Sequence, residues 1–391
     1  MPVTRAILTL NSGSSSLKLG LFTETLETLA LAHVDRIGRR EAAMVIRDAA
    51  GARLPLPAAA PDAFATNAAA LRTALATFEA QFDGLDVIAV GHRIVHGGTD
   101  HAAPERITEP LMADLARLAP FAPLHQPHNL AGVRAALEAF PGTPQIACYD
   151  TAFHRGHPFV SDTFALPRRY YEKGVRRYGF HGLSYDYITS ELARSEPALH
   201  AGRVAVAHLG SGASMCAIAQ GRSVASTMGF SALEGLPMGT RPGELDPGIL
   251  LYMLDEEGLT SHEIATLLYK ESGLLGMSGL SNDMRVLEAS DAPRAQEAID
   301  YFCFRIRRQV GAMAAAMGGL DGVVFCGGIG ENSGRVRAQA CEGLEFLGLE
   351  IDAAANAANA RDIGSGRVRV LVLPTNEEIV IARGASAVLD L

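Results

Sequence analysis

A pattern of strand, Gly/Ser turn and strand occurs twice in this sequence, and the two copies lie about 200 residues apart. The first copy covers residues 6–21 around the turn at 11–16, and the second covers residues 204–219 around the turn at 210–214. Apolar runs of this length on either side of a Gly/Ser cluster predict two strands joined by a tight turn. The repetition favours two duplicated domains that each open with this hairpin; two unrelated hairpins are the alternative.

The length and the order of the remaining elements also favour two α/β domains. A chain of 391 residues exceeds what one hydrophobic core usually serves. A second hairpin is predicted at residues 43–56. Strands and helices then alternate, which indicates α/β architecture: strands at 87–90, 145–149, 322–326 and 368–373, and helices at 67–82, 295–317 and from residue 377. Because polar residues follow several of these strands, we expect ligands at the strand ends.

Charge and composition exclude several classes of protein. The net charge of −9 and the pI near 5.8 disfavour nucleic acid as a partner, because duplex binding needs a basic face. No apolar run approaches the roughly 18 residues of a membrane span, and the first run is too short for a signal peptide. We therefore expect a cytoplasmic protein without membrane contact. The cysteines are scattered and are predicted to be reduced core residues: Cys148, Cys216, Cys303, Cys326 and Cys341.

The two Gly/Ser turns are suited to binding phosphate. Glycine lets the backbone approach a ligand closely, while backbone N–H groups and serine hydroxyls donate to phosphate oxygens. Neither turn is a Walker A loop, since each joins two strands and no GxxxxGK[ST] occurs. One such turn usually means only a turn. Two matched turns and a third glycine-rich segment at 327–332 predict a nucleotide site, although that segment also reads as a plain strand–helix connection.

Two arginines and one lysine stand beside glycine-rich backbone. Arg93 lies in GHRIVHGG after a predicted strand, and Arg241 lies in GTRPG. A planar guanidinium in this setting suits bidentate recognition of carboxylate or phosphate, whereas the alternative is a surface arginine in a loop. Lysine occurs at only three positions, and one of them, Lys18, follows the first Gly/Ser turn.

A carboxylate and several histidines complete the candidate chemistry. Asp150 ends a predicted strand, where it either orients a reacting group or caps a helix. His125, His181 and His208 lie in Gly- or Pro-rich segments, and each is alternatively a structural histidine. No His/Cys set has zinc spacing. Magnesium fits better, because it needs only one or two protein oxygens beside phosphates and water.

These segments together resemble the acetate kinase family, from residue 7 to about residue 383. The matching motifs occur in the family's order: NSGSSSLK, GHRIVHGG, PLHQPHN, DTAFH, YGFHGLS, HLGSGAS, EGLPMGTRPGELDPG, SNDMR, GGIGEN and PTNEE. The family belongs to the superfamily of sugar kinases, heat-shock chaperones and actin. The resemblance implies two duplicated actin-like, ribonuclease H-like domains that face each other across an active-site cleft. We expect the first domain at residues 1–150 plus about 384–391, and the nucleotide-binding domain at residues 151–383.

The resemblance also implies a role for each matching residue. Asn11 and Glu377 are expected to hold Mg²⁺, with Mn²⁺ as a possible substitute. Asp150, His181 and Arg241 are expected to be catalytic, the last two by stabilising the transferring phosphoryl group. The expected substrate-binding residues are Arg93, which grips the carboxylate, with Val95, Leu124, His125, Phe180 and Ala232. The expected nucleotide-binding residues are Lys18, His208, Leu209, Gly210, Ser211, Gly212, Asp283, Met284, Arg285, Gly328, Ile329, Gly330, Glu331 and Asn332.

The activity implied is reversible phosphoryl transfer from ATP to acetate, which gives acetyl phosphate and ADP and serves acetyl-CoA biosynthesis. Acetate is already an anionic nucleophile, so the reaction needs positioning and charge neutralisation more than a general base. We therefore expect direct in-line transfer without a phosphoenzyme. The family further implies a homodimer.

Three other functions stay open at this level. A propionate or butyrate kinase of the same family differs only in the volume of the acyl pocket. A nucleotide switch like actin or the chaperones has no use for a carboxylate clamp such as Arg93, and a sugar kinase needs a polar acceptor pocket. Two positions depart from the family pattern: Ser211 stands where asparagine is common, and Ala232 stands where proline is frequent. The smaller side chain at position 232 leads us to expect appreciable use of propionate.

Overall fold

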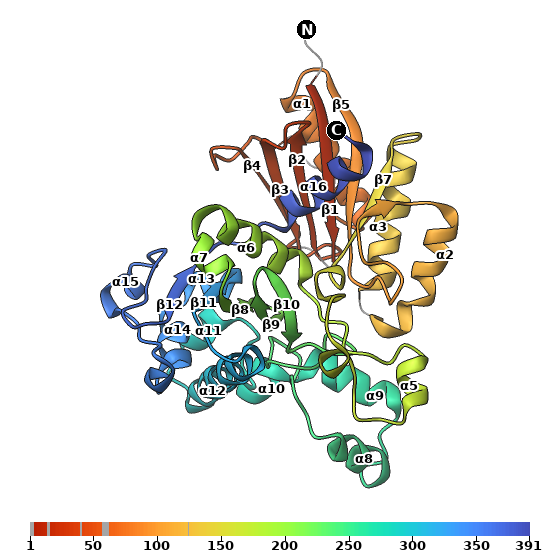
Figure 1. Cartoon of the computed structure of the whole chain (residues 1–391). Helices are drawn as coiled ribbons and strands as arrows, with labels where there is room; N and C mark the ends of the chain where they lie inside the picture. Colours follow the sequence, from red (N-terminus) through yellow and green to blue (C-terminus); the bar gives the residue numbers. More distant parts are fainter. Residues whose placement is uncertain (1–3, 14–15, 40, 57–61, 124) are drawn as a thin grey trace. The chain divides into compact units, whose positions relative to one another are not determined.

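The structure, a computed structural model, describes residues 4–13, 16–39, 41–56, 62–123 and 125–391 (Figure 1). The chain divides into two compact units. Unit 1 consists of Met1–Ala152 and Asn376–Leu391, and unit 2 consists of Phe153–Thr375. We expected the chain to return to the first domain near residue 384. The observed return at Asn376 differs because the whole C-terminal helix packs against strands of unit 1.

Unit 1 contains one sheet with helices on both faces. Its elements are β1 (Thr4–Ser12), β2 (Ser16–Thr23), β3 (Thr28–Asp35), β4 (Ala43–Asp48), α1 (Asn67–Gln81), β5 (Leu85–Ile94), β6 (Glu105–Arg106), α2 (Glu109–Arg117), the 3₁₀ turn η1 (Ala119–Phe121), α3 (Gln126–Ala139), β7 (Gln145–Tyr149) and α16 (Glu377–Leu389). Within the described residues the strand order is β4-β3-β2-β1-β5-β7-β6. β1 pairs antiparallel with β2 and parallel with β5, and β5 pairs parallel with β7.

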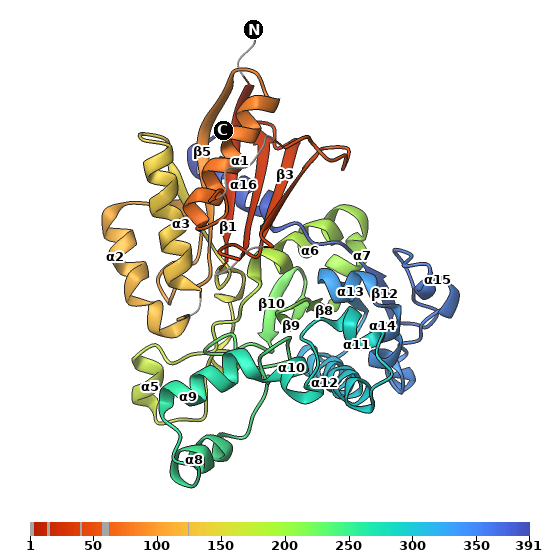
Figure 2. The same cartoon turned by 180° about the vertical axis from the view of Figure 1, so that it is seen from behind.

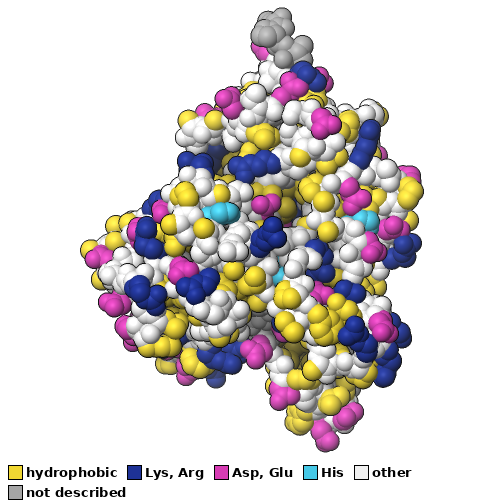
Figure 3. All heavy atoms as spheres, in the orientation of Figure 1, with side chains coloured by type: hydrophobic (Ala, Val, Ile, Leu, Met, Phe, Trp, Pro, Cys, Tyr) yellow, Lys and Arg dark blue, Asp and Glu magenta, His cyan; other side chains and the backbone are white. Residues whose placement is uncertain are grey.

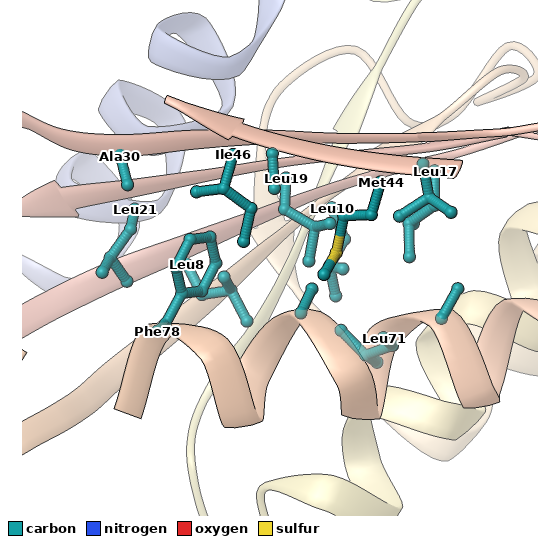
Figure 4. Close-up of a cluster of buried hydrophobic side chains, with 14 of the residues drawn as sticks. Leu8, Leu10, Leu17, Leu19, Leu21, Ala30, Met44, Ile46, Leu71 and Phe78 are labelled. Atoms are coloured by element: carbon teal, nitrogen blue, oxygen red, sulfur yellow. The ribbon is translucent and has the colours of Figure 1, made fainter. Parts of the chain in front are cut away.

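Helix α16 packs on one face of this sheet against β1, β5 and β7, and α1 and α3 pack on the opposite face (Figures 1 and 2). Figure 4 shows the core between the sheet and α1, where Phe78 and Leu71 meet leucines of β1 and β2. Both helix residues are almost fully buried, and so are Leu8 and Leu19. Burial of each such side chain contributes about 1.5–3 kcal/mol, so this layer gives the strand ends a firm support.

Unit 2 begins with a loop-rich segment and continues into a second sheet. Its elements are the 3₁₀ turn η2 (Ala152–His154), α4 (Phe159–Asp162), α5 (Arg168–Glu172), α6 (Gly182–Ser195), α7 (Pro197–His200), β8 (Arg203–Leu209), β9 (Ala213–Ala219), β10 (Arg222–Ser226), α8 (Pro247–Asp255), α9 (Ser261–Thr266), the π-helical turn η3 (Leu267–Glu271), α10 (Gly273–Ser278), α11 (Met284–Glu288), α12 (Pro293–Met317), β11 (Gly322–Cys326), α13 (Gly327–Asn332), α14 (Gly334–Cys341), the 3₁₀ turn η4 (Glu345–Leu347), α15 (Ala353–Ala357) and β12 (Arg369–Val372).

Five strands of the first sheet, β3-β2-β1-β5-β7, have the same order as the second sheet, which supports the duplication predicted from the sequence. In the part of unit 2 that the structure describes, the strand order is β10-β9-β8-β11-β12. β8 pairs antiparallel with β9 and parallel with β11, just as β1 pairs with β2 and β5. β12 then lies parallel to β11 as β7 lies parallel to β5. Helix α12 packs against β8, β9 and β10, while α6 and α7 contact β8.

Two local predictions differ from the structure in detail. The hairpin expected at residues 43–56 is present but short: the Asp48 N–H donates to the Ala52 carbonyl at 3.0 Å across the turn, and an antiparallel bridge joins Arg47 to Arg53. The longer ladder of β4 is with β3. The GGIGEN segment, expected as a connection between a strand and a helix, is itself the short helix α13. The turn between β1 and β2 can be described only in part, because residues 14–15 lie outside the described residues.

Surface and core agree with the composition. On the face drawn in Figure 3, Lys/Arg and Asp/Glu side chains are interspersed and do not gather in one broad basic patch. No helix among the described residues is both long and apolar enough to cross a membrane. All five cysteines are buried, as predicted for core residues.

Candidate active site

The pair of the partly buried Arg93 and the buried Asp150 is the centre of the polar residues in unit 1. Arg93 is on β5, and Asp150 directly follows the neighbouring parallel strand β7, so the sheet places both at the same edge. Arg93 Nε donates to both carboxylate oxygens of Asp150 at 3.1 Å, and Nη2 donates to Oδ2 at 2.5 Å. The Asp150 residue is only 1% exposed. Such a bidentate, charge-assisted pair orients the guanidinium firmly.

Asn11 and Glu377 extend this network. Arg93 Nη1 donates to Asn11 Oδ1 at 3.0 Å and lies 3.8 Å from Glu377 Oε2, while Asn11 Nδ2 donates to the same Glu377 oxygen at 3.0 Å. Glu377 is the first residue of α16, which brings it from the far end of the sequence to the end of β1. Burial by itself lowers the pKa of the Arg93 guanidinium, but the Asp150 and Glu377 carboxylates outweigh burial and hold that pKa above its usual value.

Asn129 is a site residue that the sequence reasoning missed. Its Oδ1 accepts from the backbone N–H of Val95 at 3.0 Å, and its Nδ2 donates to the carbonyl of Ser12 at 2.7 Å. One buried amide on α3 therefore ties together the ends of β1 and β5. The signal was present in the PLHQPHN motif, but an asparagine on a predicted helix gives no hint of its distant partners.

The other predicted residues of unit 1 have more varied surroundings. Val95 is buried, and His125 is the N-cap residue of α3. Leu124 lies outside the described residues. Lys18 is exposed on β2, opposite Asn11 in the β1–β2 ladder. Burial raises the pKa of Glu378, and the nearby Lys18 acts in the opposite direction.

His181 is held in unit 2 by a chain of short hydrogen bonds. It stands at the N-cap of α6 in left-handed backbone conformation, with φ 59° and ψ 26°. Its Nδ1 lies 2.8 Å from Ser214 Oγ, which lies 2.5 Å from the hydroxyl of Tyr185. The ring stacks on His208 with 4.3 Å between the ring centroids. His208 is anchored in the same manner, with Nδ1 2.8 Å from Ser184 Oγ. These contacts orient Nε2 of His181.

His181 and Arg241 converge on Gly212. A Cβ atom added to Gly212 would lie 3.0 Å from Arg241 Nη2 and 3.2 Å from His181 Nε2. Arg241 Nη1 donates to the carbonyl of Ala232 at 2.7 Å, which fixes the direction of the guanidinium. Burial lowers the pKa of Arg241 to about 10, so it remains protonated at neutral pH. The Arg241 guanidinium thus meets the His181 ring, whose Nε2 donates when Nδ1 accepts from Ser214, at the second Gly/Ser turn, an arrangement suited to phosphate oxygens.

A cavity of about 620 Å³ opens beside the same turn. Three segments that were predicted to bind nucleotide line this cavity: the second Gly/Ser turn, the start of α11, and α13. The predicted residues among the lining are Gly210, Ser211, Asp283, Met284, Arg285, Gly328, Ile329 and Asn332. The volume is within the range of small-molecule and cofactor sites. From the sequence, a common role for these segments was implied only by the family resemblance. In the structure they line one cavity.

The cavity also contains residues that the sequence reasoning missed, and it omits some predicted ones. Asn282, Glu288 and Ser333 are additional lining residues. Ser333 Oγ donates to Glu288 Oε1 at 2.5 Å, which links α14 to α11. Gly330 and Glu331 lie in α13 but do not line the cavity. The predicted acyl-pocket residues Phe180 and Ala232 belong to unit 2, the former buried and the latter partly exposed.

The predicted metal ligands are chemically suited to magnesium. Among the described residues there is no group of three or more His, Cys, Asp or Glu side chains that could hold a metal ion. Asn11 and Glu377 supply an amide and a carboxylate oxygen within one hydrogen-bonded set. Magnesium accepts so few protein ligands because substrate phosphates and water complete its shell.

The duplicated sheets, the nucleotide-sized cavity and the carboxylate-paired arginine define an α/β phosphotransferase of the actin-like class. A model of the acetokinase family matches residues 6–383. The chain therefore belongs to the acetokinase family, and it is an enzyme that transfers phosphoryl groups.

Relatives and solved structures agree with this assignment. The chain is 52% identical to an acetate kinase of Methylocella silvestris, with 99% of each chain covered, and 46% identical to one of Nitrobacter hamburgensis, with 97% and 95% covered. It is similar in structure to acetate kinase of Porphyromonas gingivalis, with a TM-score of 0.85, 36% identity and 98% and 100% covered. It is also similar to a propionate kinase of Francisella tularensis, with a TM-score of 0.88, 32% identity and 98% and 99% covered.

Proposed function

We propose that this enzyme transfers a phosphoryl group reversibly between ATP and acetate, which gives acetyl phosphate and ADP. One observation carries the chemistry: His181 Nε2 and Arg241 Nη2 converge on Gly212, next to the cavity of about 620 Å³. The names of the relatives support acetate as the acceptor.

ATP is proposed to bind in the cavity of unit 2. The backbone of Gly210 and Ser211 faces the phosphates, while α11 and α13 enclose the nucleoside. The terminal phosphoryl group then meets His181 and Arg241. Donors that are already oriented stabilise charge on the equatorial oxygens without reorganisation at the moment of transfer.

The acetate carboxylate is proposed to bind Arg93. Among the contacts of the described residues, this guanidinium uses one N–H of Nε, one of Nη1 and one of Nη2. An arginine has five N–H groups, so each terminal nitrogen keeps one more N–H that can donate to a second carboxylate, although Nη1 also lies 3.8 Å from Glu377 Oε2. Asp150 acts through Arg93, because it keeps the guanidinium fixed and compensates its charge.

The acceptor needs no strong base, since acetate is an anion before it reacts. The reaction has to bring two anions together and neutralise their repulsion. Asn11 and Glu377 would hold Mg²⁺, or Mn²⁺, and the metal would supply further positive charge to offset the charge of the anions. We therefore propose direct in-line transfer, with the roles of Lys18 and His125 in nucleotide and substrate binding as predicted above. A homodimer, a cytoplasmic location and a place in acetyl-CoA biosynthesis are proposed from the family resemblance.

The preferred length of the acyl chain depends on the side chain at position 232. Ala232 is small and partly exposed, and its carbonyl accepts from Arg241, so it combines a short side chain with a fixed backbone. A difference of one methylene in such a pocket is worth about 1–3 kcal/mol. Propionate is therefore the second substrate to test. An Ala232→Pro variant is expected to raise the ratio of kcat/KM for acetate over propionate; an unchanged ratio would refute the role of this position.

The decisive experiment is a hydroxamate assay for acyl phosphate with acetate, propionate and butyrate in parallel. Acetyl phosphate formed from ATP and acetate is the expected result. ATP binding without acyl phosphate from any of the three acids would contradict the proposal and favour a nucleotide switch. ADP formation that requires an added sugar, and not one of the three acids, would favour a sugar kinase.

A further inference from the structure

The backbone that carries Phe180 and His181 turns sharply before α6. Gly179 has φ +74° and His181 has φ 59°, both in the left-handed region. Non-glycine residues adopt this region rarely, and they do so when surrounding contacts hold them there. The direction of the His181 side chain therefore depends on what supports this turn from outside.

His154 supplies that support. It is fully buried in η2, and its Nε2 lies 3.1 Å from the carbonyl oxygen of Phe180. Its ring also fills the space beside Gly179, where an added Cβ would lie 2.5 Å from His154 Cδ2. The His154 ring therefore occupies the space that the absent side chain of Gly179 leaves, and it also binds the carbonyl of Phe180.

The hydrogen bonds around His154 determine the position of its proton. A carbonyl oxygen only accepts, so Nε2 of His154 donates to Phe180. The other nitrogen, Nδ1, lies 2.8 Å from Ser223 Oγ and must accept from that hydroxyl in the neutral ring. Burial lowers the pKa of His154 to about 3, which keeps the ring neutral. Ser223 Oγ then accepts from His157 Nε2 at 2.6 Å.

His154 also contacts the side-chain network of His181. Its ring meets the ring of Tyr185 edge to face, with 5.7 Å between the centroids. The hydroxyl of Tyr185 lies 2.5 Å from Ser214 Oγ, which lies 2.8 Å from Nδ1 of His181. The His154 ring therefore supports the backbone that precedes His181. It also contacts Tyr185, whose hydroxyl bonds the serine that holds the His181 ring.

We propose that His154 is a positioning residue for phosphoryl transfer: it fixes the Gly179–Phe180–His181 turn and so aims His181 at the transferring group. Only the role of His181 in catalysis rests on the proposed function. His154 itself touches neither substrate nor metal in this proposal. It acts through the carbonyl of Phe180 and through the ring of Tyr185.

Two substitutions separate this role from general packing. His154→Gln keeps an N–H group near the position of Nε2, whereas His154→Asn retains a polar group only near Nδ1. We expect His154→Asn to lower kcat about tenfold or more while the KM for ATP stays within about twofold, and His154→Gln to recover most of kcat. His262→Asn, on the exposed start of α9, is the matched control and should leave kcat unchanged.

A second measurement, the protonation of His154 in the wild-type protein, depends neither on activity nor on the stability of a variant. The ¹⁵N spectrum of histidine-labelled wild-type protein should show His154 neutral with its proton on Nε2, its signal assigned by its loss in His154→Gln or its shift in Ser223→Ala. A proton on Nδ1, or equal kcat in the Asn and Gln variants, would overturn the proposal. If the wild-type protein makes no acyl phosphate, the proposed function fails, and the tautomer still decides whether His154 holds the turn.

Discussion

Replacement of Gly212 by alanine tests the phosphoryl site most directly. The added methyl group would stand 3.0 Å from Arg241 Nη2 and 3.2 Å from His181 Nε2, whereas ordinary contacts begin at 3.4 Å. Both neighbours must therefore retreat by a few tenths of an ångström. Neither moves freely, because Arg241 donates to the carbonyl of Ala232 at 2.7 Å and His181 is bonded to Ser214 at 2.8 Å.

The expected effect falls on catalysis more than on stability. Displacements of this size at donors that contact the transferring group should lower kcat about tenfold, which corresponds to about 1.4 kcal/mol of transition-state stabilisation. Gly212 does not have a positive φ, so alanine fits its backbone and the midpoint of thermal unfolding should change little. Initial rates in the hydroxamate assay, with ATP and acetate varied in turn, separate kcat from the two KM values.

Gly311→Ala is the matched control for this substitution. Gly311 lies in the middle of α12, and an added Cβ would meet nothing within 4 Å. The same chemical change should there leave kcat unchanged and stabilise the helix by about 0.5–1 kcal/mol. A Gly212→Ala enzyme with kcat within twofold of wild type would refute the placement of the transferring group at this turn.

Three further substitutions test other parts of the structure. Arg93→Lys retains a charge beside Asp150 but loses the planar fork, so the KM for acetate should rise about tenfold or more with little change in the KM for ATP; equal effects on both would contradict the carboxylate role. Arg337→Lys breaks a fully buried guanidinium that donates to the Gly330 carbonyl in α13, so the KM for ATP should rise more than that for acetate, and the reverse order would argue against this support. Burial lowers the pKa of His92 to about 4, below the ordinary value near 6.5, so its contribution to stability is present above pH ~6.5 and is lost as the pH falls toward 4. In His92→Gln the loss of stability between pH 7 and pH 5, measured by urea unfolding, should be smaller by up to about 2 kcal/mol, and an unchanged loss would exclude His92 as a cause.

The sequence predicted the fold well where periodicity and turns were strong. The paired hairpins, the strands at 145–149 and 322–326 and the long helix α12 were all expected, because apolar period and glycine punctuation are local signals. Strand β4 shows the limit. Its own residues indicated a hairpin, and a short one forms with Arg53, but its longer pairing with β3 could not be predicted because strand pairing is not a local property.

The site was predictable by residue type but not by contact. Arg93 and Asp150 each stood out beside a strand end, and the parallel pairing of β5 and β7 makes them partners. Asn129 and His154 carried no comparable signal, because their partners are backbone groups far away in the sequence or across a turn. Side chains that support the backbone of a site cannot be predicted without the fold. Side chains suited to contact a ligand can be proposed from their residue type and sequence context.

The return of α16 to unit 1 has a consequence for how the protein is made. Ile381, Ala382 and Ala385 of this helix are fully buried against the sheet that begins with β1. The ribosome therefore releases the first strands of unit 1 long before the helix that covers them. At roughly 5–20 residues per second, synthesis of residues 153–391 takes on the order of 10–50 s. Unit 2 can complete its core during that delay, so we expect unit 1 to become resistant to protease later than unit 2.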